Sequence, residues 1–267
     1  MSGKPFLKWA GGKRWLVDRE EFKIPSYTGR YIEPFLGGGA VFFFLQPTAS
    51  ILSDINPKLI ETYQSIRDDW KTVWSILSEH QIKHCSEYYY RQRGYQPGTP
   101  AERAALFLYL NRSCWNGLYR ENLKGQFNVP IGTKTKILMD DDDFQWTSQR
   151  LEKSEISCCD FADTIKKSEA GDFLFVDPPY TTAHNMNGFV KYNQNIFSWE
   201  DQIRLRDELV AARNRGVHIV STNANHQSVH DLYRNCGELY EVSRASVISG
   251  KKKGRSSTEE LLIVLEP

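Results

Sequence analysis

The sequence has no long hydrophobic run, and its longest apolar stretches, such as AVFFFL at residues 40–45, suit an ordinary protein core. A helix that spans a bilayer needs about 20 consecutive apolar residues, and a secretory signal peptide carries an apolar segment near the N-terminus. Neither pattern occurs here. We therefore expect a cytoplasmic protein whose 267 residues form one larger α/β domain, or a domain that carries an insertion.

Paired cysteines are also missing. The chain has five cysteines, and no two of them have the two-residue spacing of a metal or redox motif. We expect reduced thiols, as is usual in cytosolic proteins. His226 and His230 have a spacing that suits metal ligands on a helix, but the glutamate-containing zinc signature is absent. We therefore expect no metal site.

A strong charge of one sign is absent as well, because the formal net charge is only +1. Global charge therefore does not indicate a polyanionic partner, whereas local charge is more informative. Residues 112–136 contain five basic residues and one acid, and residues 250–257 (GKKKGRSS) contain four more basic residues. The acidic stretch MDDDDF at 139–144 is typical of a solvated turn.

Short apolar segments alternate with amphipathic ones in both end regions of the chain. We expect a helix from near Ala40, and another over 198–216 that has Ser198 as its N-cap and Gly216 as its stop. The segment 172–177 is nearly all apolar, which predicts a strand buried on both faces. Strands are expected at 31–35, 50–54, 155–159, 172–177, 217–222 and 260–266. This alternation predicts a doubly wound, parallel α/β sheet.

The middle of the chain, residues 57–149, breaks this alternation. We expect helices at 58–81 and 99–112, followed by a β-hairpin over 117–132 that turns at Lys124-Gly125. The hairpin stretch is aromatic, basic and rich in Asn and Arg. The pattern indicates a helical domain inserted into the α/β fold.

A glycine-rich turn, EPFLGGGAVF at 33–42, lies between the first expected strand and its helix. Glycines permit a tight turn and the close approach of a ligand to the backbone, although the dinucleotide fingerprint is incomplete. Asp54 ends the next strand, where an acid accepts hydrogen bonds from ribose hydroxyls. Together these features indicate an adenosine-type ligand. The alternatives are a plain tight turn, and Asp54 as the N-cap of the following helix.

The segment FLFVDPPYTT at 173–182 ends a buried strand with Asp177-Pro178-Pro179-Tyr180. In α/β proteins, the carboxyl ends of the strands face the ligand crevice. The Asp177 carboxylate and the Pro178 carbonyl can each accept one N–H of an exocyclic amine, and Tyr180 can stack on the ring that carries it. The prolines stiffen the turn. The alternative is a strand terminator with no chemical role.

Several longer motifs resemble the DNA adenine-N6 methyltransferases of the Dam type, in the α-class order. They are FLKWAGGK (6–13), EPFLGGGAVFF (33–43), LSDIN (52–56), LFLYLNR (106–112), WNGLYRENLKGQFNVPIG (115–132), DPPY (177–180), STNAN (221–225) and EELL (259–262). The resemblance implies a Rossmann-like catalytic domain at 1–56 and 150–267 that binds S-adenosylmethionine. It also implies a target recognition domain at 57–149 that binds double-stranded DNA.

The resemblance assigns roles residue by residue. Asp177, Pro178, Pro179 and Tyr180 are the implied catalytic residues. The implied cofactor-binding residues are Trp9, Lys13, Gly37, Gly39, Asp54, Asp160 and Asp177. The implied DNA-binding residues are Lys8, Arg112, Trp115, Asn116, Leu118, Arg120, Lys124, Asn128, Pro130 and Lys134, and the lysines at 251–253 would meet phosphates.

This assignment implies that the target adenine is flipped out of the duplex, at a cost of a few kcal/mol. Trp115 and Asn116 match the pair that fills the gap the base leaves. The methylated site is expected to be GATC, with one departure: Thr133 stands after the VPIG turn, where relatives that read GATC usually have Arg. Lys134 follows, but Lys does not reproduce the bidentate geometry of Arg.

Other activities remain open from the sequence. A cytosine-N4 methyltransferase uses the same amine chemistry, and an RNA or protein-glutamine methyltransferase uses a similar tetrad without a base-reading hairpin. A DNA-binding repressor without catalysis is disfavoured by the presence of Lys13, Asp177 and Tyr180. We further expect a monomer, a possible cognate restriction endonuclease as partner, and a lid at 184–189.

Overall fold

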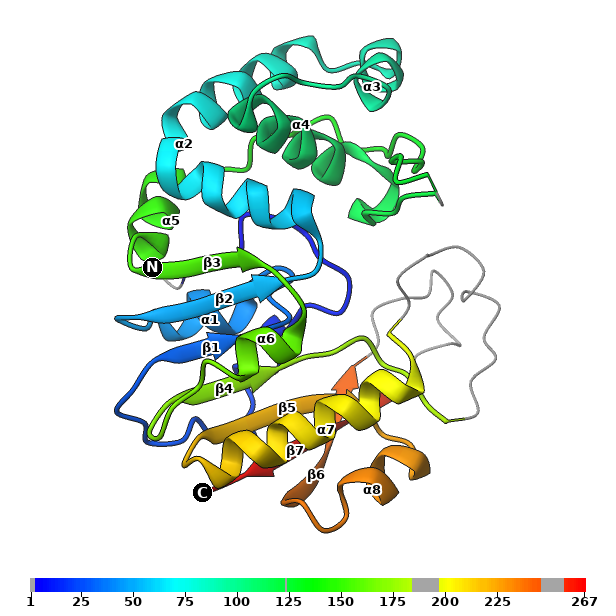
Figure 1. Cartoon of the computed structure of the whole chain (residues 1–267). Coiled ribbons are helices and arrows are strands. Elements are labelled where there is room, and N and C mark those ends of the chain that lie inside the picture. The colour runs from blue at the N-terminus through cyan, green and yellow to red at the C-terminus, as the bar shows by residue number, and fades with distance from the viewer. Residues whose placement is uncertain (1–2, 123, 184–196, 246–256) are drawn as a thin grey trace.

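The computed structural model describes residues 3–122, 124–183, 197–245 and 257–267, and its centre is one seven-stranded sheet. The strand order is β3-β2-β1-β4-β5-β7-β6 (Figure 1). Strands β1 to β5 are parallel, and β7 is antiparallel to both β5 and β6. The strand bounds are β1 Tyr31–Glu33, β2 Ser50–Asp54, β3 Ser154–Cys158, β4 Phe173–Val176, β5 His218–Ala224, β6 Glu238–Ala245 and β7 Ser257–Leu265.

The buried strand β4 shows how the sequence positions two layers of helix. Successive side chains of a strand point to opposite faces. Phe173 and Phe175 join one apolar cluster, and Leu174 and Val176 join another. Figure 1 shows α6 (Phe161–Ile165) and α7 (Trp199–Asn214) on one face, with α1 (Ala40–Leu45) on the other. The prediction that this strand is buried on both faces is confirmed.

Helix α7 begins and ends where its sequence predicts. The Ser198 side chain accepts a hydrogen bond from the Asp201 amide, and the Asp201 carboxylate accepts one from the Ser198 amide, which is a capping box. Past the C-terminal end, Gly216 has a φ of +93°, a conformation that glycine adopts without strain.

The sequence did not predict the edge strand β6. Among the described side chains of β6, only Val242 is buried, so the segment lacks the apolar run that marks the other strands. An edge strand has one neighbour and largely exposed side chains, so hydrophobicity alone does not reveal it.

The insertion forms a helical lobe, made of α2 (Pro57–Lys83), α3 (Ser86–Arg93), α4 (Pro100–Ser113), η2 (Trp115–Gly117) and α5 (Phe144–Leu151). Helix α2 is interrupted at Asp69, whose φ and ψ are −149° and 55°. Figure 1 shows the lobe lying beyond the β3 edge of the sheet. Its apolar core is continuous with one face of the sheet, because residues such as Tyr63, Phe6 and Phe43 pack together.

The described residues of the expected β-hairpin over 117–132 do not form a pair of strands. Its described residues form two isolated antiparallel bridges, Cys114 to Ile131 and Glu121 to Phe127. Backbone amides of Asn122 and Asn128 donate to the carbonyls of Gln126 and Arg120. The chain therefore does double back near Lys124-Gly125, but with few ladder contacts.

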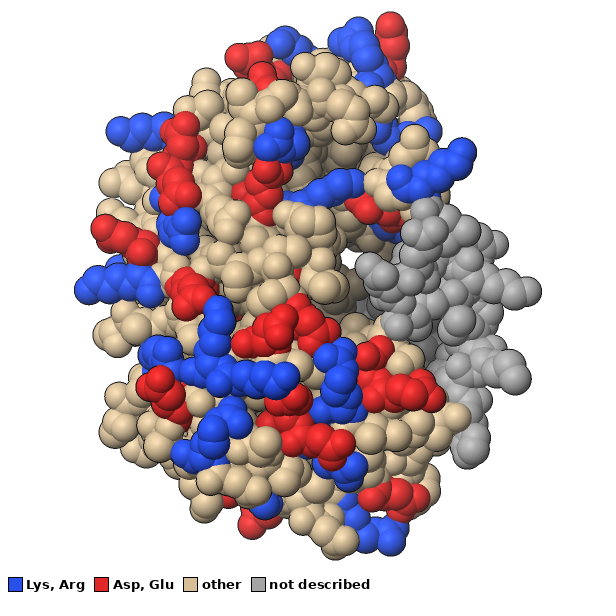
Figure 2. All heavy atoms as spheres, in the orientation of Figure 1, with Lys and Arg blue, Asp and Glu red and all other residues tan. Residues whose placement is uncertain are grey.

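The described surface carries both signs of charge. Figure 2 shows Lys and Arg side chains interspersed with Asp and Glu over one face of the molecule. No helix in the described part of the chain combines the length and the apolar character needed to cross a membrane. The basic segment 251–253 and the expected lid at 184–189 lie outside the described residues.

Candidate functional site

The site lies where the strand order reverses. From β1 the chain proceeds to β2 on one side, and from β4 it proceeds to β5 on the other, while β1 and β4 are themselves neighbours. In doubly wound sheets, the crevice outside the carboxyl ends of such strands binds ligands. The glycine turn at Gly37–Gly39 follows β1, and Asp177 follows β4.

The glycine turn requires glycine at two positions. Gly37 and Gly39 have φ values of +46° and +64°, which strain other residues. A Cβ on Gly37 would also lie 2.7 Å from Trp9 Cδ1, and one on Gly39 would lie 2.9 Å from the Tyr63 hydroxyl oxygen. Trp9 therefore packs directly on the turn.

Trp9 also connects the turn to the helical lobe. Its ring stacks on Phe107 of α4 and on Tyr119, with centroid separations of 6.4 Å and 6.0 Å. A side chain at the N-terminal end of the sequence thus contacts both the sheet crevice and the insertion.

Asp54 holds the turn rather than capping a helix. Its Oδ2 accepts the Gly37 amide at 3.0 Å, and its Oδ1 accepts the Asn56 amide at 3.0 Å. Asn56 is the N-cap of α2, so the alternative that Asp54 caps this helix is wrong. Burial raises the pKa of Asp54, and these amides oppose the rise. A carboxylate has about four acceptor sites, so acceptor capacity remains for ribose hydroxyls.

Asp160 has a partner that the sequence did not predict. Arg204 of α7 donates to both of its oxygens, at 2.6 Å and 2.9 Å, and the Arg204 hydrogen bonds lower the pKa of Asp160. Asp160 also accepts the Ala162 amide as the N-cap of α6. Its oxygens are therefore more fully used by the protein than those of Asp54.

Asp177 is held by one lysine and one threonine. Lys13 Nζ lies 2.9 Å from Asp177 Oδ1, and the Thr222 hydroxyl donates to the same oxygen at 2.6 Å. Burial raises the pKa of Asp177, while Lys13 and Thr222 lower it. Pro178 is buried and Pro179 is exposed.

Tyr180 presents an accessible ring that is anchored at its hydroxyl. The ring lies 4.8 Å from Lys13 Nζ, and the hydroxyl donates to Glu260 Oε2 at 2.5 Å. Burial raises the pKa of Tyr180 well above its ordinary value, so its hydroxyl remains a donor at neutral pH. The sequence assigned no role to Thr222 or Glu260, although they lie in the STNAN and EELL motifs that carry the family resemblance.

Most residues expected to meet DNA lie on one exposed segment of the helical lobe. Trp115 is 53% exposed and Leu118 is 45% exposed, and Asn116 between them has a φ of +57°. The Arg120 guanidinium donates to the Asn128 side chain at 2.9 Å. The segment 115–134 therefore presents aromatic, apolar and hydrogen-bonding groups together. Lys124, Pro130 and Lys134 are exposed on the same segment.

Lys8 reaches this segment from the N-terminal region. Its backbone exchanges two hydrogen bonds with the Asn111 side chain, at 3.0 Å and 2.8 Å. A Cβ on Gly117 would lie 2.8 Å from Lys8 Cδ, so Lys8 crosses the η2 turn. The neighbouring Lys134 side chain, together with burial, lowers the pKa of Lys8 to about 8.

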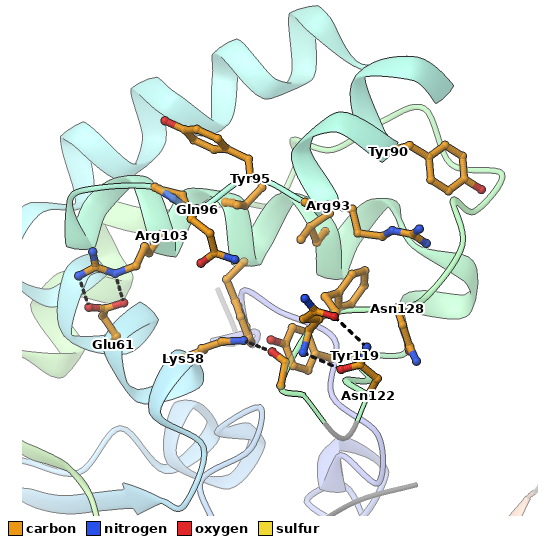
Figure 3. A pocket seen from close by; sticks show the side chains of 18 residues that line it. Lys58, Glu61, Tyr90, Arg93, Tyr95, Gln96, Arg103, Tyr119, Asn122 and Asn128 are labelled. Carbon is orange, nitrogen blue, oxygen red and sulfur yellow. Dashed lines mark hydrogen bonds and ion pairs between the residues drawn. The ribbon is translucent and has the colours of Figure 1, made fainter.

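A separate cavity of about 430 Å³ lies in the helical lobe, between the start of α2, the α3–α4 connection and segment 119–128. Figure 3 shows Arg103 paired with Glu61 and Asn122 lying near Asn128 at its wall. Lys58 is held by Glu121 and the Gly125 carbonyl. Residues 177–180 do not line this cavity.

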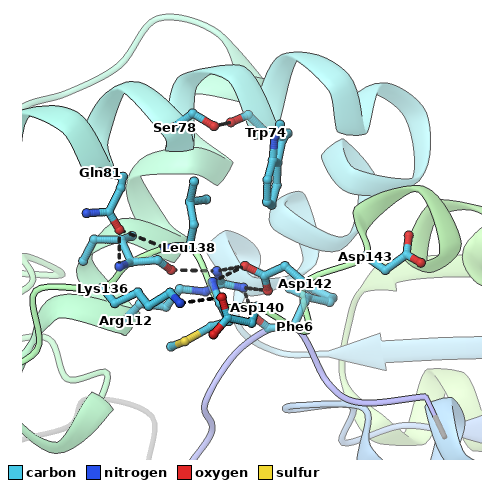
Figure 4. A network of polar contacts seen from close by, with 12 residues as sticks. Phe6, Trp74, Ser78, Gln81, Arg112, Lys136, Leu138, Asp140, Asp142 and Asp143 are labelled. Carbon is cyan, nitrogen blue, oxygen red and sulfur yellow. Dashed lines mark hydrogen bonds and ion pairs between the residues drawn. The ribbon is translucent and has the colours of Figure 1, made fainter. Parts of the chain in front are cut away.

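Arg112 is a correction to the sequence prediction. It was expected to bind DNA, but it is 2% exposed and donates to both oxygens of Asp142, at 2.6 Å and 2.7 Å. It also donates to the carbonyls of Phe6 and Ile137 (Figure 4). A guanidinium with these partners ties α4 to the N-terminal segment and to the loop before α5.

The acidic stretch 139–144 is a second correction. Asp142 is 4% exposed within this network, and Asp143 caps α5 by accepting the Trp146 amide. The stretch is therefore only partly a solvated turn. Within the described ranges, no group of three or more His, Cys, Asp or Glu residues is placed to hold a metal ion.

The sheet and the crevice at its switch point are consistent with the Rossmann-like fold of methyltransferases. The sequence model of the D12 class N6 adenine-specific DNA methyltransferases matches residues 9–248. This match covers most of the chain, so the protein belongs to that family.

Full-length relatives agree. A DNA adenine methylase of Serratia marcescens is 35% identical over 97% of this chain and 97% of its own. A type II methyltransferase of Lactococcus lactis subsp. cremoris is 32% identical over 97% and 94%. The DNA adenine methylase of Escherichia coli K12 is 30% identical over 99% and 96%. The predicted family, activity and cofactor are confirmed: the chain is an adenine-specific DNA methyltransferase that uses S-adenosylmethionine.

Proposed function

We propose that this enzyme methylates N6 of an adenine flipped out of double-stranded DNA, within the sequence GATC. The observation that carries the proposal is the juxtaposition of Asp177 and Tyr180, after β4, with the glycine turn after β1. One crevice thus offers an acceptor for an amine, a face for a ring and a turn for a nucleotide.

The cofactor fits the glycine turn. Gly37 and Gly39 supply backbone without side chains, Asp54 retains acceptor capacity, and Ile55 beside it is 60% exposed and apolar. Trp9 and Lys13 close the same crevice. S-adenosylmethionine supplies a methyl group on a positively charged sulfur. Asp160 would contribute only through acceptor capacity that Arg204 leaves.

The target base is held by the tetrad. Asp177 accepts one N–H of the exocyclic amine and the Pro178 carbonyl accepts the other, while Tyr180 stacks on the ring. These contacts draw the amine lone pair out of conjugation with the ring and aim it. Positioning and hydrogen bonding therefore supply the catalysis.

The DNA is read by the helical lobe. Trp115 and Asn116 take the space of the extruded base, which recovers part of the flipping cost. Arg120, held by Asn128, is oriented for a bidentate contact with guanine, the commonest specific contact in the major groove. Leu118 and Pro130 contact base edges, Lys8 and Lys134 approach the same end of the site, and Lys124 meets phosphate.

The test is methyl transfer from labelled S-adenosylmethionine to unmethylated DNA, with Asp177→Ala as the inactive variant. Asp68→Ala, an exposed acid of the helical lobe, is the control. N6-methyladenine at GATC, lost only in Asp177→Ala, supports the proposal. Methylation of adenine in another sequence overturns the GATC site and keeps the chemistry. Product as N4-methylcytosine, or cofactor binding without transfer, overturns the activity.

A further inference from the structure

Glu260 reaches the catalytic crevice because of the direction of its strand. The parallel strands bring their carboxyl ends to the crevice, but β7 runs antiparallel to β5 and pairs Glu260 with Ala224, the last residue of β5. The beginning of β7 therefore lies at the edge where the parallel strands end. The Glu260 side chain is buried there, with 6% of it exposed.

The buried carboxylate is engaged by two residues of the crevice. Its Oε2 accepts the Tyr180 hydroxyl at 2.5 Å and lies 3.3 Å from Lys13 Nζ. Lys13 is itself 4% exposed and lies 2.9 Å from Asp177. Burying a carboxylate is costly unless it is paired and hydrogen-bonded. These contacts offset that cost and link Glu260 to both ends of the tetrad.

We propose that Glu260 is a positioning residue for methyl transfer, which fixes the Tyr180 ring through its hydroxyl and shares Lys13 with Asp177. The proposal rests on the proposed roles of Asp177 and Tyr180.

The geometry explains why such a residue is needed. Tyr180 is 38% exposed, so packing within the described part of the chain does not fully enclose its ring. A phenol tethered at its hydroxyl keeps one ring orientation. Lys13 lies between the carboxylates of Asp177 and Glu260, so the position of its ammonium group is fixed from two sides. The ammonium group in turn fixes the Asp177 oxygen that it contacts. Displacements of about 1 Å in reacting groups cost about 100-fold in rate.

The principal variant is Glu260→Gln, which has the same shape and removes the charge that holds Lys13. Its matched control is Glu259→Gln, because Glu259 is the adjacent residue, is exposed and contacts Asn225 instead. We expect Glu260→Gln to lower the single-turnover methylation rate by about 100-fold. The dissociation constants for S-adenosylmethionine and DNA should change less than about threefold, and Glu259→Gln should behave as wild type.

A second variant tests the coupling to the tyrosine. Tyr180→Phe keeps the stacking face and removes the hydroxyl. If Glu260 acts through this hydroxyl, the rate loss of Glu260→Gln with Tyr180→Phe is smaller than the product of the single losses. The fluorescence anisotropy of 2-aminopurine at the target position should also fall in both variants, because the flipped base then rotates more freely.

The pH profile separates positioning from a merely structural role. The charged and titratable groups around Asp177 are Lys13, Glu33, Tyr180 and Glu260. Glu260 is one of the charges that raise the pKa of Asp177. The Glu260→Gln variant should therefore lower the pKa of Asp177 and move the acid limb of the pH–rate profile to lower pH. General destabilisation would not cause this shift.

The outcomes are distinct. A wild-type enzyme that transfers no methyl group to adenine overturns the proposed function, whatever the variants do. An active wild type with a Glu260→Gln rate within about threefold of it, or with losses fully multiplicative with Tyr180→Phe, overturns the positioning role alone.

Discussion

Lys8 illustrates how one neighbour changes the charge available for DNA. The neighbouring Lys134 side chain and burial disfavour its charged form, so the pKa of Lys8 falls from 10.5 to about 8. The nearby Cys114 stays neutral over this range, because burial raises its pKa to about 11. Lys8 therefore loses its proton between pH 7 and 9 in the free enzyme, and a DNA phosphate or base acceptor favours the protonated form.

We predict that DNA affinity weakens as the pH rises from 7 to 9, by at most about tenfold per pH unit for one proton. Lys134→Met removes the repelling charge, so the pKa of Lys8 rises and the dependence moves above this window. Fluorescence anisotropy with a GATC duplex measures the DNA affinity of the wild type and of Lys134→Met at each pH.

Lys136→Met is the control, since Lys136 pairs with Asp140 instead. An unchanged pH dependence in Lys134→Met would contradict the coupling between the two lysines.

At the scale of elements, α4 and the loop before α5 are joined by one buried ion pair. Arg112 and Asp142 are both nearly inaccessible, and the guanidinium also satisfies two backbone carbonyls. Removing one member of a buried pair leaves an uncompensated charge, which is more costly than the pair itself is stabilising.

We predict that Arg112→Met lowers the free energy of unfolding by about 3–5 kcal/mol, measured by urea denaturation. The double variant Arg112→Met with Asp142→Leu should recover part of this loss. DNA affinity per folded molecule should stay near wild type.

Arg120→Met is the contrasting variant, because Arg120 is exposed and, within the described part of the chain, its guanidinium donates to Asn128. It should weaken specific DNA binding with little change in stability. A stable Arg112→Met protein with weak DNA binding would restore the original prediction for Arg112.

Elements defined by local chemistry were predictable. The glycine turn, the strand before Asp177 and the Ser198 cap each depend on adjacent residues, and the structure has them at the expected positions. Strand β6 was not predictable from the sequence. Only one of its described side chains is buried, so the segment shows no periodic hydrophobic pattern. The described residues of the expected hairpin form isolated bridges instead of the two paired strands that the sequence suggested.

At the scale of the whole molecule the charges nearly balance, so we expect the attraction to DNA to be local. The net charge is +1, and Figure 2 shows both signs over the face it displays. Binding to DNA then depends on the particular lysines and arginines that contact phosphates, each of which releases counterions.

We predict that the logarithm of the DNA association constant falls linearly with the logarithm of salt concentration. Lys124→Ala should reduce the slope by about 1, the value for one phosphate contact on duplex DNA. The control is Lys153→Ala. Lys153 directly precedes β3, so it lies at the amino ends of the parallel strands, whereas the crevice lies at their carboxyl ends; the slope should stay unchanged. Equal slopes for wild type and Lys124→Ala would exclude that contact.

The sequence by itself determined the local chemistry: the glycine turn, the Asp-Pro-Pro-Tyr strand end, the helix caps and the order of motifs that indicates the family. These features are set by neighbouring residues, so they can be seen without coordinates. Only the tertiary structure decided that Glu260, Thr222 and Lys13 meet at Asp177 and Tyr180, and that Arg112 is buried. Those contacts depend on strand direction and on the packing of segments far apart in the chain, which no local pattern encodes.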